Sequence, residues 1–461
     1  MSKTNDLGKD KIFSLIIKLA VPAMIAQLVN VLYSIVDRMF IGNIKDIGDI
    51  ALAGVGVCSP IVTLLTSFAT LVGIGGSILM AMKMGEKNNK EAENILANSF
   101  LLMVIFSISL TFIFLLTKEK LLIWFGASDT TFSYANTYLT IYTIGTFFAV
   151  LALGLNFFIT CQGFATTGMI TVIIGAICNI ILDYIFIFIF DMAVAGAALA
   201  TIISQMLSCL YVLLFLFGKR PIIKIKFNGY SFRIIKDIIK FGLSPFIIIA
   251  TDSIIVIIMN TVLQVYGGKE QGDLLISAAT IVQSYFMLIT CPLIGITSGT
   301  QAIISYNYGA YRTDRVKQAE KIILILALSF CSIMFAVSQL IPKYFVGIFT
   351  NNPDNISLAI WGIKTFTLAI IPMGFQYTFV DGLTALGKTK TALFLSVCRK
   401  TNYSILLMML PAFLGAKSAF YAQPIADLVG GILSTTLFLF VFSKHLKMRD
   451  QQKVLEENFP H

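Results

Sequence analysis

The sequence predicts an all-α integral membrane protein with twelve transmembrane helices, arranged as two parallel six-helix repeats. Composition is the first reason, because 57% of the residues are hydrophobic, only 13% are charged and the mean hydropathy is +0.86. The second reason is an internal repeat, in which glycines of the first half recur about 224 positions later. The repeated pairs are Gly75 and Gly299, Gly85 and Gly309, and Gly163 and Gly387.

Each predicted span is an apolar stretch long enough to cross a bilayer core, which takes roughly 20 residues of α-helix. Continuous apolar runs such as residues 180–190 favour helices over barrel strands, which alternate apolar and polar residues. Six spans per half return the chain to its starting side, so both halves have the same orientation, as in parallel-repeat transporters. The spans begin near Leu15, Ile50, Ile95, Tyr134, Gly168, Ala193, Asp237, Leu274, Lys321, Leu358, Thr389 and Gly415.

The distribution of basic residues predicts the orientation of the chain. Of the 34 Lys and Arg residues, 24 fall in the tails and the even-numbered loops, and 6 fall in the odd-numbered loops. By the positive-inside rule this bias places both termini in the cytoplasm. It also accounts for the net charge of +10 without a nucleic acid partner. We therefore expect a multi-pass protein of the plasma membrane whose partner is the lipid bilayer.

The densest basic cluster lies between the sixth and seventh spans and divides the chain into two bundles. A cluster of this kind lies favourably at an anionic lipid surface. We expect the protein to function as a monomer. The predicted units are an N-terminal six-helix bundle over residues 1–218, a basic cytoplasmic linker over 219–236, a C-terminal six-helix bundle over 237–443 and a polar cytoplasmic tail over 444–461.

The residue types that enzymes and metal centres use are sparse. The seven cysteines form no close pair, which argues against a disulfide framework or a zinc site. Both histidines, His445 and His461, lie in the C-terminal tail, so an intramembrane histidine centre has no residues to use. The pattern Gly-x-x-x-x-Gly-Lys occurs at 382–388, but it lies at the end of an apolar membrane span and not between a strand and a helix, so it is not read as a nucleotide-binding loop and we expect no direct drive by ATP. We therefore expect no enzyme activity and no cofactor.

A polar stripe marks the first span. A carboxylate at the centre of a membrane helix costs about 2.5–3.5 kcal/mol on insertion scales, so such residues are candidates for function. Gln27, Asn30, Ser34 and Asp37 are spaced three, four and three apart, which places them on one helical face. The stripe needs water or polar partners. In the alternative interpretation, Asp37 lies near the helix end and only pairs with Arg38.

The fifth span carries an amide and a carboxylate on one face, because Asn179 and Asp183 are four residues apart. Together they could hold a hard cation with oxygen ligands, or a proton on a buried carboxyl group. The same pair could instead form hydrogen bonds to a neighbouring helix. Spacing alone leaves both interpretations open.

Five motifs, in order along the chain, resemble the multidrug and toxic compound extrusion (MATE) family. The resemblance covers nearly the whole sequence. The motifs are Val-Asp-Arg-Met-Phe-Ile-Gly at 36–42, Asn179-x-x-x-Asp183, Ala-Gly-Ala-Ala-Leu-Ala-Thr at 195–201 with Ser204-Gln205, Ala-Leu-Gly-Lys at 385–388 and Gln-Pro-Ile-Ala-Asp at 423–427.

The resemblance implies a V-shaped pair of six-helix bundles, related by a pseudo-two-fold axis normal to the membrane, around a central cavity. It implies extrusion of small organic cations in exchange for Na+ or H+ by alternating access. Carried over by position, the family's cation site falls on Asp37, Asn179, Asp183 and Thr201, which would be the ligands of a Na+ ion or hold a proton. Which of the two ions is used stays open.

Acidic and aromatic residues in the second half suggest a surface for a lipophilic cation. Asp252 lies in the seventh span, and Tyr377 and Asp381 fall near one face of the tenth. Rings attract cations, Met adapts to varied shapes and a carboxylate neutralises the charge. Arg399 and Asp427 are expected to pair structurally. The candidate substrate-cavity residues are Gln27, Asn30, Ser34, Asp252, Gln283, Met287, Tyr377 and Asp381.

Two other functions remain open. One is a flippase for a lipid-linked precursor, whose cavity should be rich in Arg and Lys, and the other is an exporter of a cellular metabolite. Acidic residues outnumber clear mid-membrane bases in this sequence, which favours a cationic substrate. A facilitator of the other large twelve-span class usually carries Asp-Arg-x-Gly after its second span, where this chain has Met-Gly-Glu-Lys-Asn at 84–88.

Overall fold

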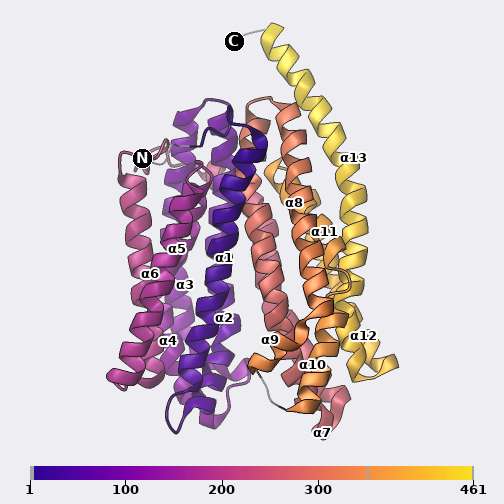
Figure 1. Ribbon diagram of the computed structural model, residues 1–461. Coiled ribbons are helices and arrows are strands. Elements are labelled where there is room, and N and C mark those ends of the chain that lie inside the picture. The colour runs from indigo at the N-terminus through magenta and orange to yellow at the C-terminus, as the bar shows by residue number, and fades with distance from the viewer. Residues whose placement is uncertain (1–4, 350–351, 459–461) are drawn as a thin grey trace.

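The fold was analysed in a computed structural model that describes residues 5–349 and 352–458. Within these ranges every regular element is a helix, and no strand occurs. Most of the helices run side by side along one direction, and the start of α1 and the end of α13 lie toward the same end of the molecule (Figure 1). We call this the terminal end and the opposite one the far end. The all-α prediction is confirmed.

The first half contains six long helices separated by short turns. α5 is extended by a π-helical segment, Ile185–Ile189. The helices are α1 (Ile12–Gly42), α2 (Gly48–Gly85), α3 (Asn89–Trp124), α4 (Asp129–Thr160), α5 (Ala165–Tyr184) and α6 (Ala193–Phe217).

The second half begins with α7 (Phe232–Gly309), which contains a break at Gly268. Gly268 has φ +67°, a conformation that glycine adopts at little cost, and the break separates two limbs, Phe232–Gly268 and Leu274–Gly309. A 3₁₀ turn, Ala416–Tyr421, leads into the last helix. The remaining helices are α8 (Thr313–Leu340), α9 (Pro342–Phe349), α10 (Pro353–Phe366), α11 (Ile370–Ala385), α12 (Thr389–Leu414) and α13 (Ala422–Asn458).

Ten helices of the described chain, counting the two limbs of α7 separately, are long and apolar enough to cross a membrane. α10 and α11 meet at a 49° bend and make an eleventh crossing if they form one span. α12 has the length of a span but carries Arg399 and Lys400 in its middle, which makes it more polar than the others. The count of twelve spans in two repeats stays a prediction.

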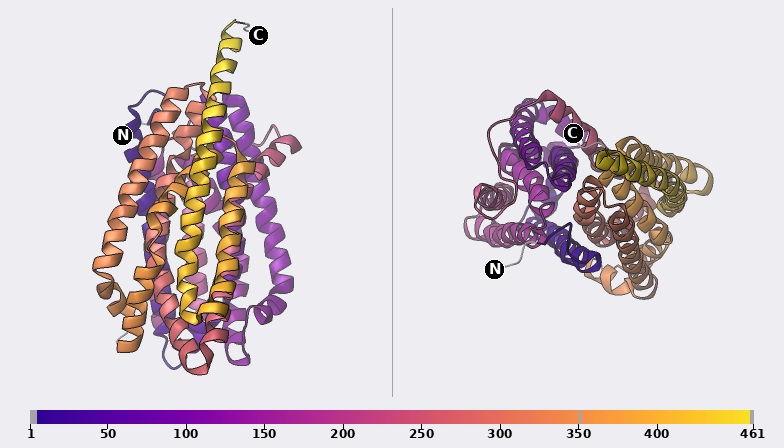
Figure 2. Two further views of the ribbon diagram at one scale, coloured as in Figure 1. Left: turned by 90° about the vertical axis from the view of Figure 1, so that its right-hand side faces the viewer. Right: turned by 90° about the horizontal axis from the view of Figure 1, so that it is seen from above.

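Two predicted boundaries differ from the structure. The linker was expected to reach residue 236, but α7 already begins at Phe232. A polar tail was expected over residues 444–461, of which 459–461 lie outside the described residues, whereas 444–458 continue α13 beyond the other helices (Figure 2). The boundaries were placed where charged residues begin, which marks where a chain leaves an apolar environment. The Lys, Leu, Met, Gln and Glu residues after position 443 favour helix, so α13 continues past that point.

The two halves lie side by side and meet at the terminal end (Figure 2). A Cβ added at Gly85 of α2 would lie 2.0 Å from the Tyr306 carbonyl oxygen, and one at Gly309 of α7 would lie 2.1 Å from that of Met82. Only glycine allows backbones to approach this closely. Gly85 and Gly309 are a repeated pair, and Met82 and Tyr306 occupy equivalent positions, because they are also 224 residues apart. A two-fold relation between the halves produces such reciprocal contacts.

Residues of the N-terminal segment also join the halves at this end. Asn5 donates a 3.0 Å hydrogen bond to the carbonyl of Gly163 in the first half. Asn307 of the second half donates to the carbonyl of Leu7 at 3.0 Å, and Arg315 donates to that of Asp10 at 2.8 Å. The segment before α1 therefore bridges the two halves.

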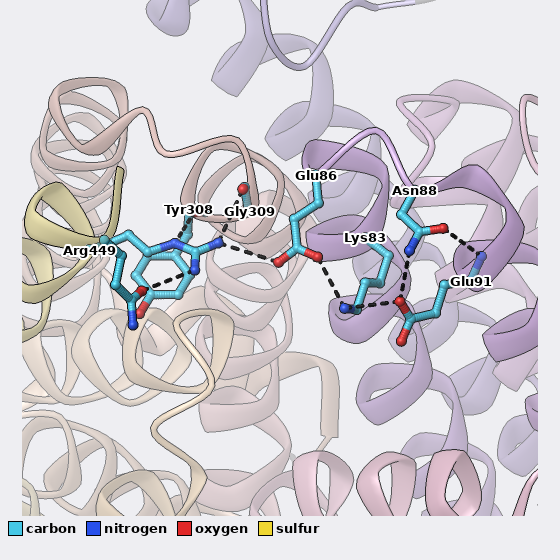
Figure 3. A network of polar contacts seen from close by, with 8 residues as sticks. Lys83, Glu86, Asn88, Glu91, Tyr308, Gly309 and Arg449 are labelled. Atoms are coloured by element: carbon cyan, nitrogen blue, oxygen red, sulfur yellow. Dashed lines mark hydrogen bonds and ion pairs between the residues drawn. The ribbon is translucent and has the colours of Figure 1, made fainter. Parts of the chain in front are cut away.

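A polar network links α13 to the turn between α2 and α3 (Figure 3). Arg449 lies 3.3 Å from Glu86 and donates to the carbonyl of Tyr308 at 3.1 Å. Glu86 pairs with Lys83 at 3.0 Å, and Lys83 also pairs with Glu91 at 3.1 Å. The end of the last helix is thus tied to the first half by charge.

Candidate functional site

The structure brings together two carboxyl groups that are 146 positions apart in the sequence, Asp37 of α1 and Asp183 of α5. They lie close enough for each carboxyl group to act on the charge of the other. Asp183 is fully buried, with 0% of its surface exposed, whereas Asp37 is partly buried. Both residues lie near the ends of their helices at the far end of the molecule. This is the first acid pair.

Asn179 and Thr201 lie beside this pair. The Asn179 amide donates to the Thr201 hydroxyl at 3.5 Å, and this hydroxyl donates to the Ala197 carbonyl at 3.0 Å. Both side chains are buried, with the hydroxyl supplied by α6. The four residues that the sequence assigns to a cation site therefore come from three helices and share one region of the first half.

The first acid pair is surrounded by acceptors that have no donor. Among the buried oxygens of the described residues that have no hydrogen-bond partner, five belong to α1, α5 and α6 in this region: Asp37 Oδ1, Asn179 Oδ1, both carboxylate oxygens of Asp183 and Gln205 Oε1. A buried acceptor left unpaired costs about 1–3 kcal/mol, and more if it is charged. A bound cation would be coordinated by oxygens of this group, and a proton would give one of them a donor.

The interpretation that Asp37 only pairs with Arg38 has no geometric support. Arg38 is exposed on α1, and none of the ion pairs found in the described chain joins it to Asp37. Adjacent residues on a helix point in different directions. The Asp37 carboxyl group instead faces Asp183 across the helix interface.

Two tyrosines near the first acid pair were not predicted from the sequence. Tyr33 lies close enough to Asp37 and Asp183 to feel both charges, and Tyr138 of α4 is buried close to Asp37. Single tyrosines in apolar spans usually fill a core, so their spacing carried no signal. Gln205, by contrast, belongs to the motif at 195–205 that resembles the MATE family.

A separate cavity of about 90 Å³ lies between the halves, bounded by α1, α2, α4, α5 and the second limb of α7. Gln27 and Asn30 of the predicted stripe line it, and Ser34 is not among the lining residues. The other polar groups of its wall are Ser77, Asn156, Thr160, Ser298 and Gln301. No acidic side chain lines this cavity within the described chain, so its polarity comes from amides and hydroxyls.

Asp252 has a partner that its sequence position did not reveal. It forms an ion pair with Lys400 of α12, although half of the Asp252 side chain is exposed. This ion pair already balances the negative charge that was expected to attract a cationic substrate. Gln283 and Met287 lie on the second limb of α7, where Met287 is exposed and Gln283 is partly buried, and neither lines the cavity.

Tyr377 belongs to a second charged group in the same half. Arg399 pairs with Asp427 at 3.0 Å, as predicted, and its guanidinium lies 5.3 Å from the centre of the Tyr377 ring. Gln423 donates to the second oxygen of Asp427 at 2.8 Å. The chain's own Arg399 therefore occupies the cation–π position of Tyr377.

Asp381 lies outside both groups. Its carboxyl group lies close to Thr297 and Gln301 of the second limb of α7 and near Glu320 of α8. Glu320 was missed because the ninth predicted span begins at Lys321, which left Glu320 in a loop where charges are expected. α8 in fact begins at Thr313 and includes Glu320.

Comparisons with known proteins agree with this architecture. The MatE family profile matches residues 22–185 and 249–410. A multidrug export protein MepA of Staphylococcus saprophyticus is 23% identical over 453 residues, covering 97% of this chain and 98% of that protein. A MepA of Staphylococcus aureus is 23% identical over 424 residues, covering 91% and 92%.

Solved structures of similar fold cover almost the whole chain. One is described as the outward-facing conformation of a multidrug resistance MATE family transporter, with a TM-score of 0.89, 23% identity and coverage of 97% and 99%. Another is a transporter from Pyrococcus furiosus, described as having a binding pocket of reverse polarity that suggests a different function, with a TM-score of 0.90, 23% identity and coverage of 97% and 99%. At this identity the likeness concerns the fold.

Proposed function

This chain belongs to the MatE family, whose members are membrane transporters and not enzymes, and we propose that it exports lipophilic organic cations in exchange for Na+ or H+. The observation that carries the proposal is the first acid pair, where two carboxyl groups face each other amid acceptors without donors. The curated relatives are named as multidrug export proteins, which supports the substrate class.

The ion acts by neutralising the first acid pair. Without an ion the two carboxylates repel each other across the interface of α1 and α5, and a bound Na+ or proton removes that repulsion. α1 contains Pro22, which removes a backbone hydrogen bond and makes the helix easier to bend. Ion binding therefore changes how α1 packs within the first half, and thereby the affinity for substrate at the cavity wall that α1 forms.

Export follows from alternating access. The ion and the substrate favour different arrangements of one carrier, so each lowers the affinity for the other by the same factor. A drug leaves toward the outside when the ion binds, the carrier changes its facing, the ion is released inside and a new drug binds. Na+ or H+ moving down its gradient provides the free energy, and no ATP is needed.

We propose that the protein lies in the plasma membrane as a monomer with both termini in the cytoplasm. The bias of basic residues supports this orientation, and the location of both termini at one end of the molecule agrees with it. The close backbone contact at Gly85 and Gly309 then closes the cytoplasmic side. The described state accordingly faces outward.

A second candidate is a flippase for a lipid-linked precursor or an exporter of a cellular metabolite. Lys400 favours it, because this base in the middle of α12 could bind an anionic group if it separated from Asp252. In the described state the two charges neutralise each other, which gives no preference for an anionic substrate. The organic cation remains the better supported substrate class.

The test is ethidium extrusion from proteoliposomes under an imposed Na+ gradient and, separately, an imposed pH gradient. Wild type is compared with Asp183→Asn and with Asp314→Asn, a control acid whose side chain is fully exposed on α8. We expect uphill export with one gradient, its loss in Asp183→Asn and its retention in Asp314→Asn. Lack of export under either gradient would refute the drug antiporter and favour the second candidate.

A further inference from the structure

The second half contains an acid pair of its own, which the proposed antiport mechanism does not use. Glu320 of α8 is only 5% exposed, and Asp381 of α11 lies close enough for its charge to act on Glu320. Both lie near the helix ends that meet at the terminal end of the molecule. We call Glu320 and Asp381 the second acid pair.

The carboxyl group of Glu320 is held against the backbone of α11. A Cβ added at Gly382 would lie 2.6 Å from Glu320 Oε1 and 2.8 Å from Oε2. Any side chain at position 382 would therefore displace this carboxyl group from its place beside Asp381. The missing Cβ of Gly382 makes the room that the acid occupies.

The two acids differ in their partners. Asp381 has the polar side chains of Thr297 and Gln301 close to its carboxyl group. Both oxygens of Glu320 are buried and have no hydrogen-bond partner in the described chain. None of the ion pairs of that part of the chain includes either acid. Two acids without a base are expensive to bury unless a positive charge joins them.

The size of the group limits what that charge can be. No cluster of three or more His, Cys, Asp or Glu residues exists in the described chain, and divalent metals are usually held by more protein ligands than two carboxyl groups provide. A single positive charge leaves the pair close to neutral, either as one proton shared by the carboxyl groups or as Na+ with oxygens of Thr297 and Gln301 as further ligands.

We propose that Glu320 and Asp381 form a second binding site for a monovalent cation, Na+ or H+, near the terminal end of the second half. It is separate from the first acid pair, which lies in the other half near the far end. Gln301 both contacts Asp381 and lines the cavity between the halves, so an ion at this site lies one side chain away from the cavity.

The test measures cation binding to the purified full-length protein in detergent, so it does not depend on the identity of the exported substrate. Asp183→Asn is the background, since it removes a charge of the first acid pair. Glu320→Gln, Asp381→Asn and the exposed control Asp314→Asn are each added to it. Size-exclusion chromatography and thermal unfolding show which variants are folded, and Gly382→Ala, which keeps both acids, provides a further variant of the site.

Two readouts distinguish the ions. Binding of radioactive Na+ reports a sodium site, and the infrared C=O stretch of a protonated carboxylic acid, which a carboxylate lacks, reports a proton. We expect Glu320→Gln and Asp381→Asn to weaken the remaining Na+ binding by at least about tenfold, the lower end of what removing a supporting group costs a bound metal ion, or else to remove the carboxylic-acid band. Asp314→Asn should change neither readout.

The proposal is overturned if folded Glu320→Gln, Asp381→Asn and Gly382→Ala variants all match Asp314→Asn in Na+ binding and in the infrared band. If ethidium export fails while either readout depends on Glu320, the drug-export function is refuted and the second site stands. If export succeeds and neither readout depends on Glu320, the second site is refuted and the exporter stands.

Discussion

The two acid pairs lie in halves of repeated sequence, but at positions that do not correspond to each other in the repeat. Positions 224 residues after Asp37 and Asp183 hold Thr261 and Leu407. Positions 224 residues before Glu320 and Asp381 hold Leu96 and Phe157. Each half therefore carries acids where the other half carries a hydroxyl or an apolar side chain. The comparison teaches that a repeated backbone can support chemistry that is not repeated.

The halves also differ in how they balance buried charge. The first half leaves Asp183 buried without a base, whereas the second half pairs Asp427 with Arg399 at 3.0 Å and also pairs Asp252 with Lys400. A balanced pair contributes to a fixed structure, while an unbalanced acid is ready to bind and release a cation. The second acid pair resembles the first half in this respect, although it belongs to the second.

The largest expected effect is on stability, where the paired Asp427 and the unpaired Asp183 should respond in opposite directions to mutation. Arg399→Gln leaves Asp427 buried without its base and should destabilise the protein by about 3–5 kcal/mol. Asp183→Asn removes a repelling charge and should raise the unfolding temperature measured without Na+. Thermal unfolding in detergent checks both, with Lys317→Gln on an exposed face of α8 as control. Equal destabilisation by Arg399→Gln and Asp183→Asn would contradict the distinction.

A smaller effect should separate the two acid pairs from each other. Gly382→Ala places a Cβ 2.6 Å from Glu320 Oε1, so the carboxyl group must move away from Asp381. We expect cation binding at the second acid pair to weaken by about tenfold, with binding at the first acid pair unchanged. Gly56→Ala is the matched control, because a Cβ there meets nothing within 4 Å. Measuring the effect of Gly382→Ala on cation binding in the Asp183→Asn background and in the Glu320→Gln background shows which acid pair has lost affinity.

The smallest effect is expected where the halves are joined by charge at the surface. Glu86→Gln removes the contact with Arg449 at 3.3 Å and should lower stability by about 0.2–1 kcal/mol, since partly exposed ion pairs contribute little. Salt should reduce the difference between the variant and wild type. Unfolding temperatures at low and high NaCl concentration measure it. A larger loss that persists in high salt would show that the Arg449 network stabilises the interface between the halves.

The sequence predicted the first acid pair because polar residues in long apolar helices are easily seen. Asp37 belongs to a regular stripe, and Asn179 with Asp183 belongs to a motif. The all-α architecture and most helix starts were also predictable, because bilayer-spanning helices need long apolar stretches. Helix ends were less predictable, as the continuation of α13 through residues 444–458 shows.

The second half was harder to predict because its charges are explained by distant partners. Asp252 is 148 positions from Lys400, and no spacing rule connects them. Glu320 lay just outside a predicted span, where an acid next to Lys321 is unremarkable in sequence. Its significance depends on burial, on the missing Cβ of Gly382 and on Asp381, which only the packed helices bring together.

The close backbone contacts at Gly85 and Gly309 affect how fast the two halves can separate at the terminal end. Backbone atoms meet there across a surface with no Cβ on either glycine, so this seam is held by dispersion and weak Cα–H···O contacts. Such forces decay within a fraction of an ångström, are insensitive to salt and need no proton to be moved. The glycine contact itself therefore parts and reseals without a charge being desolvated, and in the proposed transport cycle any charge cost at this end falls on the neighbouring contacts of Arg449 with Glu86 and with the Gly309 carbonyl.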